Sequence, residues 1–218
     1  MIYIEMEAIN YIAVITGDII RSGKLKGQDR EKMPGKLKSI FASLKGNAQR
    51  FSIYRGDSFQ GIVTEPEQAL ETGLEIKAGL MKITPEYPSY DCRLAIGIGR
   101  VGFMARNALE SDGEAFRNSG PALDAMNNEE RLKILTPWPE VNHELHVACK
   151  LADTILKRWT AVQAGVISRA LKGETQAAIA ASLKISQPAV SNSLKTSGWN
   201  ALEELTKRYK TLIKSHVQ

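Results

Sequence analysis

Apolar runs and amphipathic stretches alternate along the first two thirds of the chain. Residues 11–16 are continuously apolar and rich in β-branched and aromatic side chains, which predicts a central strand covered on both faces. A helix of about ten residues is expected to open at Pro34, and a hairpin to follow over 51–63. The pattern then predicts a helix over 67–83, a strand over 91–101, a helix over 112–127 and a strand over 132–136. This order favours an α+β fold of the ferredoxin-like or palm-like type, in which helices cover one face of a sheet.

Two of these elements also carry clues to their packing. The helix over 67–83 is amphipathic, with apolar or small residues at alternating spacings of four and three: Ala69, Gly73, Ile76, Leu80 and Ile83. In the strand over 91–101, Gly97 and Gly99 lie on one face, so another part of the chain is expected to approach the backbone closely there.

From Pro139 onward the pattern is helical throughout. One long helix is predicted over 139–158, and Thr160 with Gln163 predicts a capping box that starts the next helix. A last helix is expected over 199–213. We therefore divide the chain into an α+β domain (1–138), a connecting helix (139–158) and an all-α domain (159–218).

Residues 176–194, QAAIAASLKISQPAVSNSL, predict two short amphipathic helices joined by about three residues. Ser186 is expected to cap the second helix, and Pro188 is tolerated in its first turn. This is the pattern of a DNA-binding helix-turn-helix, whose second helix enters the major groove. Lys184 occupies the turn position where such motifs usually carry Gly, so a left-handed conformation there would be strained. The alternative is an ordinary pair of helices in an α-helical domain.

The second helix of this pair supplies the candidate contacts with DNA. Gln187, Ser191 and Asn192 project from its early turns and can reach base edges, where Asn and Gln pair best with adenine. Residues at the helix ends are better placed to hold phosphates. The full expected set is Thr175, Gln176, Ser186, Gln187, Pro188, Ser191, Asn192 and Lys195. A single small module binds weakly, so we expect a homodimer on a two-fold site, formed through the 139–158 helix or the sheet.

Charge is divided unevenly along the chain. Residues 1–158 carry no net charge, and the whole excess of +5 lies in residues 159–218. A polyanionic partner such as double-stranded DNA favours that placement, although solvated helix faces would also explain it. No apolar run approaches the ~20 residues needed to cross a bilayer, and the first ten residues lack the pattern of a signal peptide. With two widely separated cysteines, these features predict a cytoplasmic protein without a membrane partner.

Two acids are the candidates for chemistry in the α+β part. Asp18 ends the first strand and Asp57 lies in the hairpin turn, so both are expected to converge at one sheet edge with the backbone carbonyl of Ile19. Oxygen ligands of this kind bind Mg²⁺ or Mn²⁺ and, through the ion, a nucleoside triphosphate. Phosphate oxygens would be held nearby by Arg21, Ser22, Arg55 and Gly56. The alternative is structural, with Asp18 as a helix cap and Asp57 as a turn former.

Three segments resemble the catalytic core of class III nucleotidyl cyclases: "GDI" after the first strand, "RGDSF" in the hairpin and "LAIGIG" in a later strand. The resemblance implies that Asp18 and Asp57 are the metal carboxylates. It weakens in the following helix, where Asp124 and Asn128 stand near the positions of an Asn and an Arg of the cyclases. Without that Arg, catalysis would need another donor to the transferring phosphate, such as Arg117 or Arg131.

Over nearly its whole length the chain resembles the SatD-like family, through "TGDII", "RGDSFQ" and "SDGEAF". That resemblance implies an architecture, a cyclase-like domain before a helix-turn-helix, rather than an activity. The segment 111–120 that contains "SDGEAF" is either a capped helix start or part of a ligand cleft. His143 and His146 lie three residues apart on the 139–158 helix, where surface positions are expected rather than a metal site.

Three functions are compatible with these features. The first is a bacterial transcription regulator whose cyclase-like domain senses a nucleotide or phosphate ligand. The second is a nucleoside-triphosphate enzyme, such as a metal-dependent cyclase, with a helical targeting module. In the third, the helical tail binds a protein rather than DNA.

Overall fold

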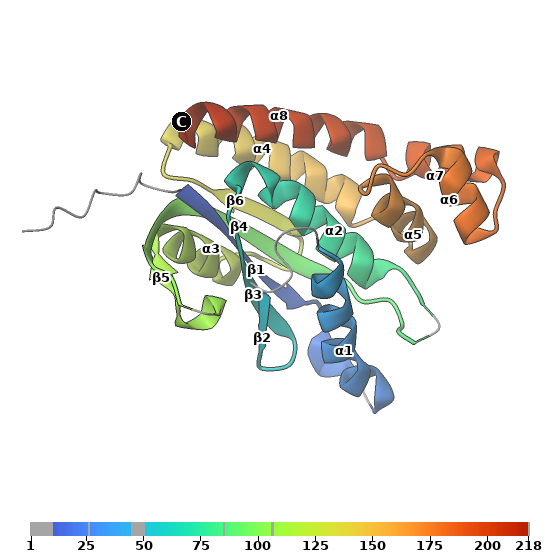
Figure 1. Ribbon diagram of the computed structural model, residues 1–218, viewed down its shortest axis with the longest axis horizontal. Coiled ribbons are helices and arrows are strands. Elements are labelled where there is room, and N and C mark those ends of the chain that lie inside the picture. The colour runs from blue at the N-terminus through green and yellow to red at the C-terminus, as the bar shows by residue number, and fades with distance from the viewer. Residues whose placement is uncertain (1–10, 26, 45–50, 85, 106, 218) are drawn as a thin grey trace, which may run out of the picture.

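The structure, a computed structural model, describes residues 11–25, 27–44, 51–84, 86–105 and 107–217. The ten N-terminal residues, on which the expectation about a signal peptide rests, lie outside these ranges. The chain forms an α+β fold in which one curved sheet is followed by five consecutive helices (Figure 1).

The sheet is built around β1 (Tyr11–Ile19), which pairs antiparallel with β3 (Ser58–Val63) on one side and with β4 (Cys92–Phe103) on the other. β2 (Phe51–Tyr54) forms a hairpin with β3 at one edge. At the other edge, β6 (Leu132–Leu135) runs parallel to β4, and the two-residue β5 (Asp112–Gly113) pairs with the end of β4. The order is therefore β2-β3-β1-β4, with β5 and β6 both paired to β4.

Helices cover both faces of the sheet, not one. Ala13 and Ile15 of β1 belong to the main apolar cluster, with α1 (Gln28–Ser43), α2 (Ala69–Met81) and α4 (Pro139–Leu156). Ile12 and Val14 point to the other face, toward α3 (Glu114–Asp124). The prediction that β1 is covered on both faces is thus confirmed, and the expectation of helices on one face only is wrong.

Two glycines explain how α3 reaches the sheet. A Cβ atom at Gly97 would lie 2.3 Å from the carbonyl oxygen of Ala115, and one at Gly99 would lie 2.6 Å from the Ala115 nitrogen. The close approach predicted for these glycines is confirmed, and the approaching chain is the first turns of α3. The segment 111–120 therefore starts a helix that packs on the sheet.

Several predicted helix boundaries differ from the structure, and two of these differences change where a residue lies. α1 begins at Gln28, six residues before Pro34, because Gly27 ends the preceding turn with a φ of 53° and acidic residues in the first turn favour the helix dipole. α2 ends at Met81, so Ile83 lies beyond the helix. Its side chain is 66% exposed, whereas the prediction placed it on the buried apolar face of the helix. Single turns of 3₁₀ helix occupy Ser22–Lys24, Pro66–Gln68 and Ala108–Glu110.

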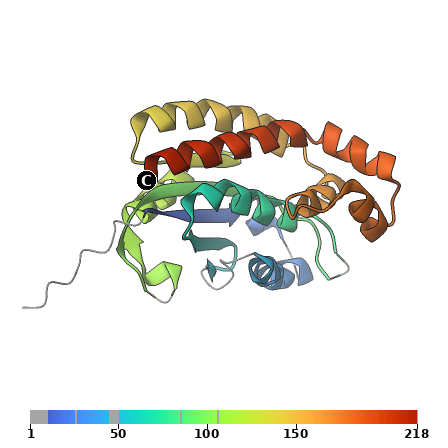
Figure 2. The same cartoon turned by 45° about the horizontal axis from the view of Figure 1, so that its top comes forward.

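The remaining helices are α5 (Ala161–Ala170), α6 (Gln176–Leu183), α7 (Gln187–Thr196) and α8 (Trp199–Val217). The predicted capping box of α5 is present, with Thr160 and Gln163 satisfying each other's backbone N–H groups. α8 runs back beside α4 over the sheet, whereas α6 and α7 lie together at one end of the molecule (Figures 1 and 2).

α8 is attached to the α+β part by both polar and apolar contacts. The Tyr209 hydroxyl donates to the carbonyl oxygen of Pro66 at 2.8 Å, and Arg208 pairs with Glu144 of α4 at 2.7 Å. Leu202 and Ile213 belong to the main apolar cluster that also contains β1 and β4. Within the described ranges, no helix has the length and apolar character needed to cross a membrane.

Candidate functional site

A pocket of about 270 Å³ opens beside the β2–β3 hairpin turn. Its walls come from the hairpin turn, the 3₁₀ turn after β1 and the start of α1, and they include Ser22, Arg30, Arg55, Gly56 and Asp57. Three of the four residues expected to hold phosphate oxygens therefore line one cavity with one of the two candidate metal carboxylates.

The two sides of this pocket are joined through Asp57. The Ser22 hydroxyl donates to Asp57 Oδ2 at 2.5 Å, and the backbone N–H of Ile19 donates to the Asp57 carbonyl oxygen at 2.9 Å. Arg30 and Arg55 are exposed, and neither has an ion-pair partner among the described residues. With two guanidinium groups and one carboxylate, the pocket carries a net positive charge suited to a phosphate group.

Asp18 is close in the sheet but differently occupied. It lies opposite Ser58 in the β1–β3 pairing, and Ser58 is the residue that follows Asp57 in the chain. Both of its carboxylate oxygens accept from Arg93, at 3.0 Å from Nε and 2.5 Å from Nη2. Arg93 also donates to the carbonyl oxygen of Met126, which fixes the guanidinium group at the end of α3. A cation bound between Asp18 and Asp57 would have to displace this arginine from Asp18.

Strained backbone occurs at the hairpin pocket and in the turn between α6 and α7. Among the described residues other than glycine, positive φ angles occur only at Arg21 (59°), Arg55 (54°) and Lys184 (55°). Arg55 lines the pocket, Arg21 directly precedes Ser22 of its wall, and Lys184 lies between α6 and α7. Strained backbone of this kind costs about 1–3 kcal/mol per residue and concentrates at functional sites.

One charged residue of the pocket was missed from the sequence, and one expected residue lies elsewhere. Arg30 lines the pocket from the first turn of α1, which the sequence-based helix start at Pro34 excluded. Arg21 is exposed and is not among the lining residues. The Asp29 and Glu31 that flank Arg30 could have indicated an earlier helix start, because acids are favoured in a first turn.

The residues considered as replacements for a cyclase arginine do not reach the pocket. Arg117 pairs with Asp112 at 2.8 Å, and Arg131 pairs with Asp91 at 3.0 Å. Asp124 lies near Tyr54, where burial first, and then the negative charges of Asp124 and Asp18, raise the pKa of the Tyr54 hydroxyl. Asp18, Asp57 and Asp124 thus all lie near Tyr54, and Arg93 forms an ion pair with Asp18.

The histidines of α4 match the expectation of surface positions, since His143 and His146 are both exposed. In the part of the chain that the structure describes, no three His, Cys, Asp or Glu side chains converge as a group that could hold a metal ion.

At the other end of the molecule, α6 and α7 pack across each other on a small apolar cluster of their own. Val190 of α7 is fully buried against Ile179 and Ala180 of α6 and Val166 of α5. Ser186 caps α7 by accepting from the backbone N–H of Ala189 at 3.3 Å, as predicted. The eight residues expected to touch DNA are all exposed: Thr175, Gln176, Ser186, Gln187, Pro188, Ser191, Asn192 and Lys195.

The positive charge of the C-terminal segment is only partly available to a partner. Five of its eight cations form ion pairs, three of them with acids of the α+β part or α4, namely Arg208 with Glu144, Lys210 with Glu71 and Lys214 with Glu67. Lys172, Lys184 and Lys195 remain without ion-pair partners among the described residues. Part of the excess charge therefore attaches α8 to the rest of the chain.

Comparison with known proteins gives a match to one family. The sequence profile of the SatD family matches residues 11–215, from the first residue of β1 into the last turns of α8. No curated protein and no solved structure matches the chain. Because the match covers nearly all of its length, this chain belongs to the SatD family.

Proposed function

We propose that the chain is a DNA-binding transcription regulator whose α+β part senses a nucleotide or a related phosphate ligand. The observation that carries this proposal is the exposed polar surface of α7. Gln187, Ser191 and Asn192 face solvent, while Val190 on the opposite side is fully buried. This exposure pattern supports a helix-turn-helix, in which the first helix supports a second that enters the major groove.

The sheet supports a palm-like interpretation of the α+β part. The elements β1, α1, β2, β3, α2 and β4 follow one another with the antiparallel order β2-β3-β1-β4, which is the order of a ferredoxin-like sheet. In such a core the hairpin turn beside the end of the first strand is where a nucleotide would bind. The pocket that contains Arg30 and Arg55 lies at that place.

A magnesium or manganese ion would find few free oxygen ligands at this pocket. Asp57 is the candidate ligand that lines the pocket. Ile19 is not among the lining residues, and Asp18 can join Asp57 only if Arg93 releases its carboxylate. A bound triphosphate could favour that exchange, because its negative charge would attract the released guanidinium group. We therefore expect metal binding to be weak without a nucleotide.

DNA binding can be tested by selecting from a pool of random duplexes with the full chain. We expect salt-sensitive binding that the Gln187→Ala, Asn192→Ala double variant weakens roughly tenfold or more, because each Asn or Gln pair with adenine contributes about 1–3 kcal/mol. Gln28→Ala, an exposed position on α1, is the matched control and should bind as the parent does. Absence of duplex binding at any salt concentration would reject the proposal.

The salt dependence gives a second measure. Lys184 precedes α7 and Lys195 lies in its last turn, and neither has an ion-pair partner in the part of the chain that the structure describes. A dimer would therefore offer about four phosphate contacts. The slope of log affinity against log salt should then be about −4. A slope near zero would favour the alternative in which this surface binds a protein.

The second candidate function is a metal-dependent nucleoside-triphosphate enzyme, favoured by the Asp57 carboxylate, which lines the pocket together with two arginines. Incubation with each triphosphate and Mn²⁺, beside Asp18→Ala and Asp57→Ala variants, tests it. Turnover that both substitutions abolish would support an enzyme. No turnover, or turnover that survives them, would leave the pocket as a sensing site.

A further inference from the structure

A second cavity, of about 490 Å³, lies where α5 meets both the loop after α2 and the turn between α6 and α7. Its lining includes Lys82 and Ile83 of the loop, Val162 of α5, and Leu183 and Ile185 beside the turn. It is separate from the pocket at the hairpin, with which it shares no lining residue.

One wall of this cavity is apolar and open to solvent. Val162 and Ile83 are 67% and 66% exposed, the highest values among the large apolar side chains that the structure describes. Leu183 and Ile185, which also line the cavity, are half-buried. Covering such side chains is favourable by about 25 cal/mol per Å² of apolar surface, so the wall suits the apolar part of a ligand.

The other wall carries excess positive charge. Lys82, Arg169 and Lys172 line the cavity together with one acid, Glu174, which is paired to Arg169 at 3.0 Å. Lys82 donates to the Ser168 hydroxyl at 3.2 Å and has no ion-pair partner among the described residues. Burial first, and then the positive charges of Lys172 and Arg169, lower the pKa of Lys82. An anion placed here would relieve that repulsion.

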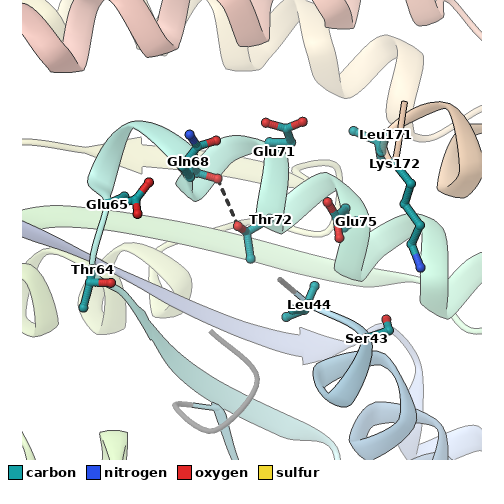
Figure 3. A pocket seen from close by; sticks show the side chains of 10 residues that line it. All are labelled: Ser43, Leu44, Thr64, Glu65, Gln68, Glu71, Thr72, Glu75, Leu171 and Lys172. Carbon is teal, nitrogen blue, oxygen red and sulfur yellow. Dashed lines mark hydrogen bonds between the residues drawn. The ribbon is translucent and has the colours of Figure 1, made fainter. Parts of the chain in front are cut away.

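Lys172 lines both this cavity and an acidic neighbouring cavity. Figure 3 shows Lys172 among the residues that line this neighbouring cavity of about 450 Å³, whose walls also include Glu65, Glu71 and Glu75. A negatively charged ligand is therefore favoured on the Lys82 side of Lys172 and disfavoured on the glutamate side.

We propose that the cavity between α5, the loop after α2 and the α6–α7 turn binds a small organic anion with one phosphate or carboxylate group and an apolar group. The anionic group contacts Lys82 and Lys172, and the apolar group packs on Ile83 and Val162. Because such a ligand touches both the α+β part and the residues beside Lys184, it would hold α6 and α7 in one orientation. Binding of the anion is independent of the proposed function. An effect of the bound anion on DNA affinity, in contrast, rests on the proposed function.

Phenyl phosphate is a suitable probe because it combines both groups, and phenol and inorganic phosphate are its two halves. The full chain, with labelled Ile, Leu, Val and Met methyl groups, is titrated with each and followed by NMR. Phenyl phosphate should shift the methyl signals of Ile83, Val162 and Ile185 and bind at least tenfold more tightly than either half. Shifts confined to Met33, beside the hairpin pocket, or absent at 10 mM would overturn the proposal.

Substitutions then assign the contacts. Lys82→Met and Lys172→Met should each weaken binding at least fivefold, whereas Lys38→Met, at an exposed site on α1, should leave it unchanged. Because the side chain at position 162 is two-thirds exposed, Val162→Glu should fold as the parent does. Its carboxylate should abolish binding by repelling the anionic group of the ligand. If Val162→Glu folds and binds phenyl phosphate as well as the parent, the proposal is wrong.

The same probe separates this inference from the proposed function. A change in duplex affinity on adding phenyl phosphate, lost in Val162→Glu, would support the coupling. Methyl shifts without any duplex binding would reject the proposed function and leave the binding site standing. Unchanged duplex affinity at saturating phenyl phosphate would reject the coupling alone.

Discussion

Lys184 offers the sharpest test of the strain between α6 and α7. Its φ of 55° and ψ of 43° place it in the left-handed region, where it ends α6 with an exposed side chain. The left-handed conformation costs an L-residue roughly 1–2 kcal/mol, and glycine avoids most of that cost. Glycine also loses more backbone entropy on folding, which offsets about 0.5–1 kcal/mol of the gain.

The net expectation for Lys184→Gly is a stabilisation of about 0.5–1 kcal/mol, which for a chain of this size raises the melting temperature by roughly 1–4 °C. Thermal melts followed by circular dichroism at fixed pH and salt would measure it. Lys184→Ala removes the same charge but keeps a Cβ atom, so it should give no such gain.

A second control reverses the sign. Lys207 is exposed in the middle of α8, where the same change from Lys to Gly should cost about 1 kcal/mol. If Lys184→Gly lowers the melting temperature as Lys207→Gly does, Lys184 is not strained and the explanation given for this turn is wrong.

Three further predictions follow from buried groups and from α4. Burial and the nearby charge of Lys82 lower the pKa of Lys36 to about 8; between pH 8 and the unfolded value of 10.5 the unfolded chain therefore binds more protons, and stability rises with pH. The free energy of unfolding in urea should increase by roughly 1 kcal/mol from pH 8 to 9 relative to a Lys36→Met variant, and a difference that does not change with pH would contradict it. Burial raises the pKa of Cys92 and Cys149 to about 12, so a thiol reagent at pH 8 should label neither until urea unfolds the chain; rapid labelling of the native protein would refute their burial. Val147 and Leu151 are 59% and 65% exposed one turn apart on α4, so if this helix is the dimer contact, Val147→Glu should give a monomer by sedimentation while Val162→Glu should not.

Local periodicity and capping were sufficient to predict most elements. The strands β1, β4 and β6, the α5 capping box and the α6–α7 pair all depend on residues within a few positions of one another. Errors arose where an end is set by a less specific feature. α1 begins before Pro34 because Gly27 and the acids after it define the start, and a proline in the second turn did not prevent the helix.

Long-range partners could not be predicted in the same way. The Asp18–Arg93 pair requires knowing that β1 lies beside β4, which places Asp18 directly opposite Arg93. The basic residues of α8 read as an exposed surface for DNA, yet Arg208 pairs with a glutamate 64 residues earlier. Neither partner is marked in the sequence, because the spacing between paired strands and packed helices is set by the whole fold.

The two apolar clusters indicate where a ligand could influence the surface proposed to bind DNA. Ala164 and Ile167 of α5 belong to the main cluster with the sheet, whereas Val166 belongs to the small cluster under α6 and α7. α5 is therefore fixed to the α+β part on one side and supports the α6–α7 pair on the other. Gly173 and Gly198, with φ of 77° and 69°, stand at either end of that pair, where the backbone can turn without a side-chain clash. Since α8 is held along α4 by ion pairs and apolar packing, a change transmitted to α7 would have to act through the end of α5, where the cavity that contains Lys82 and Lys172 opens.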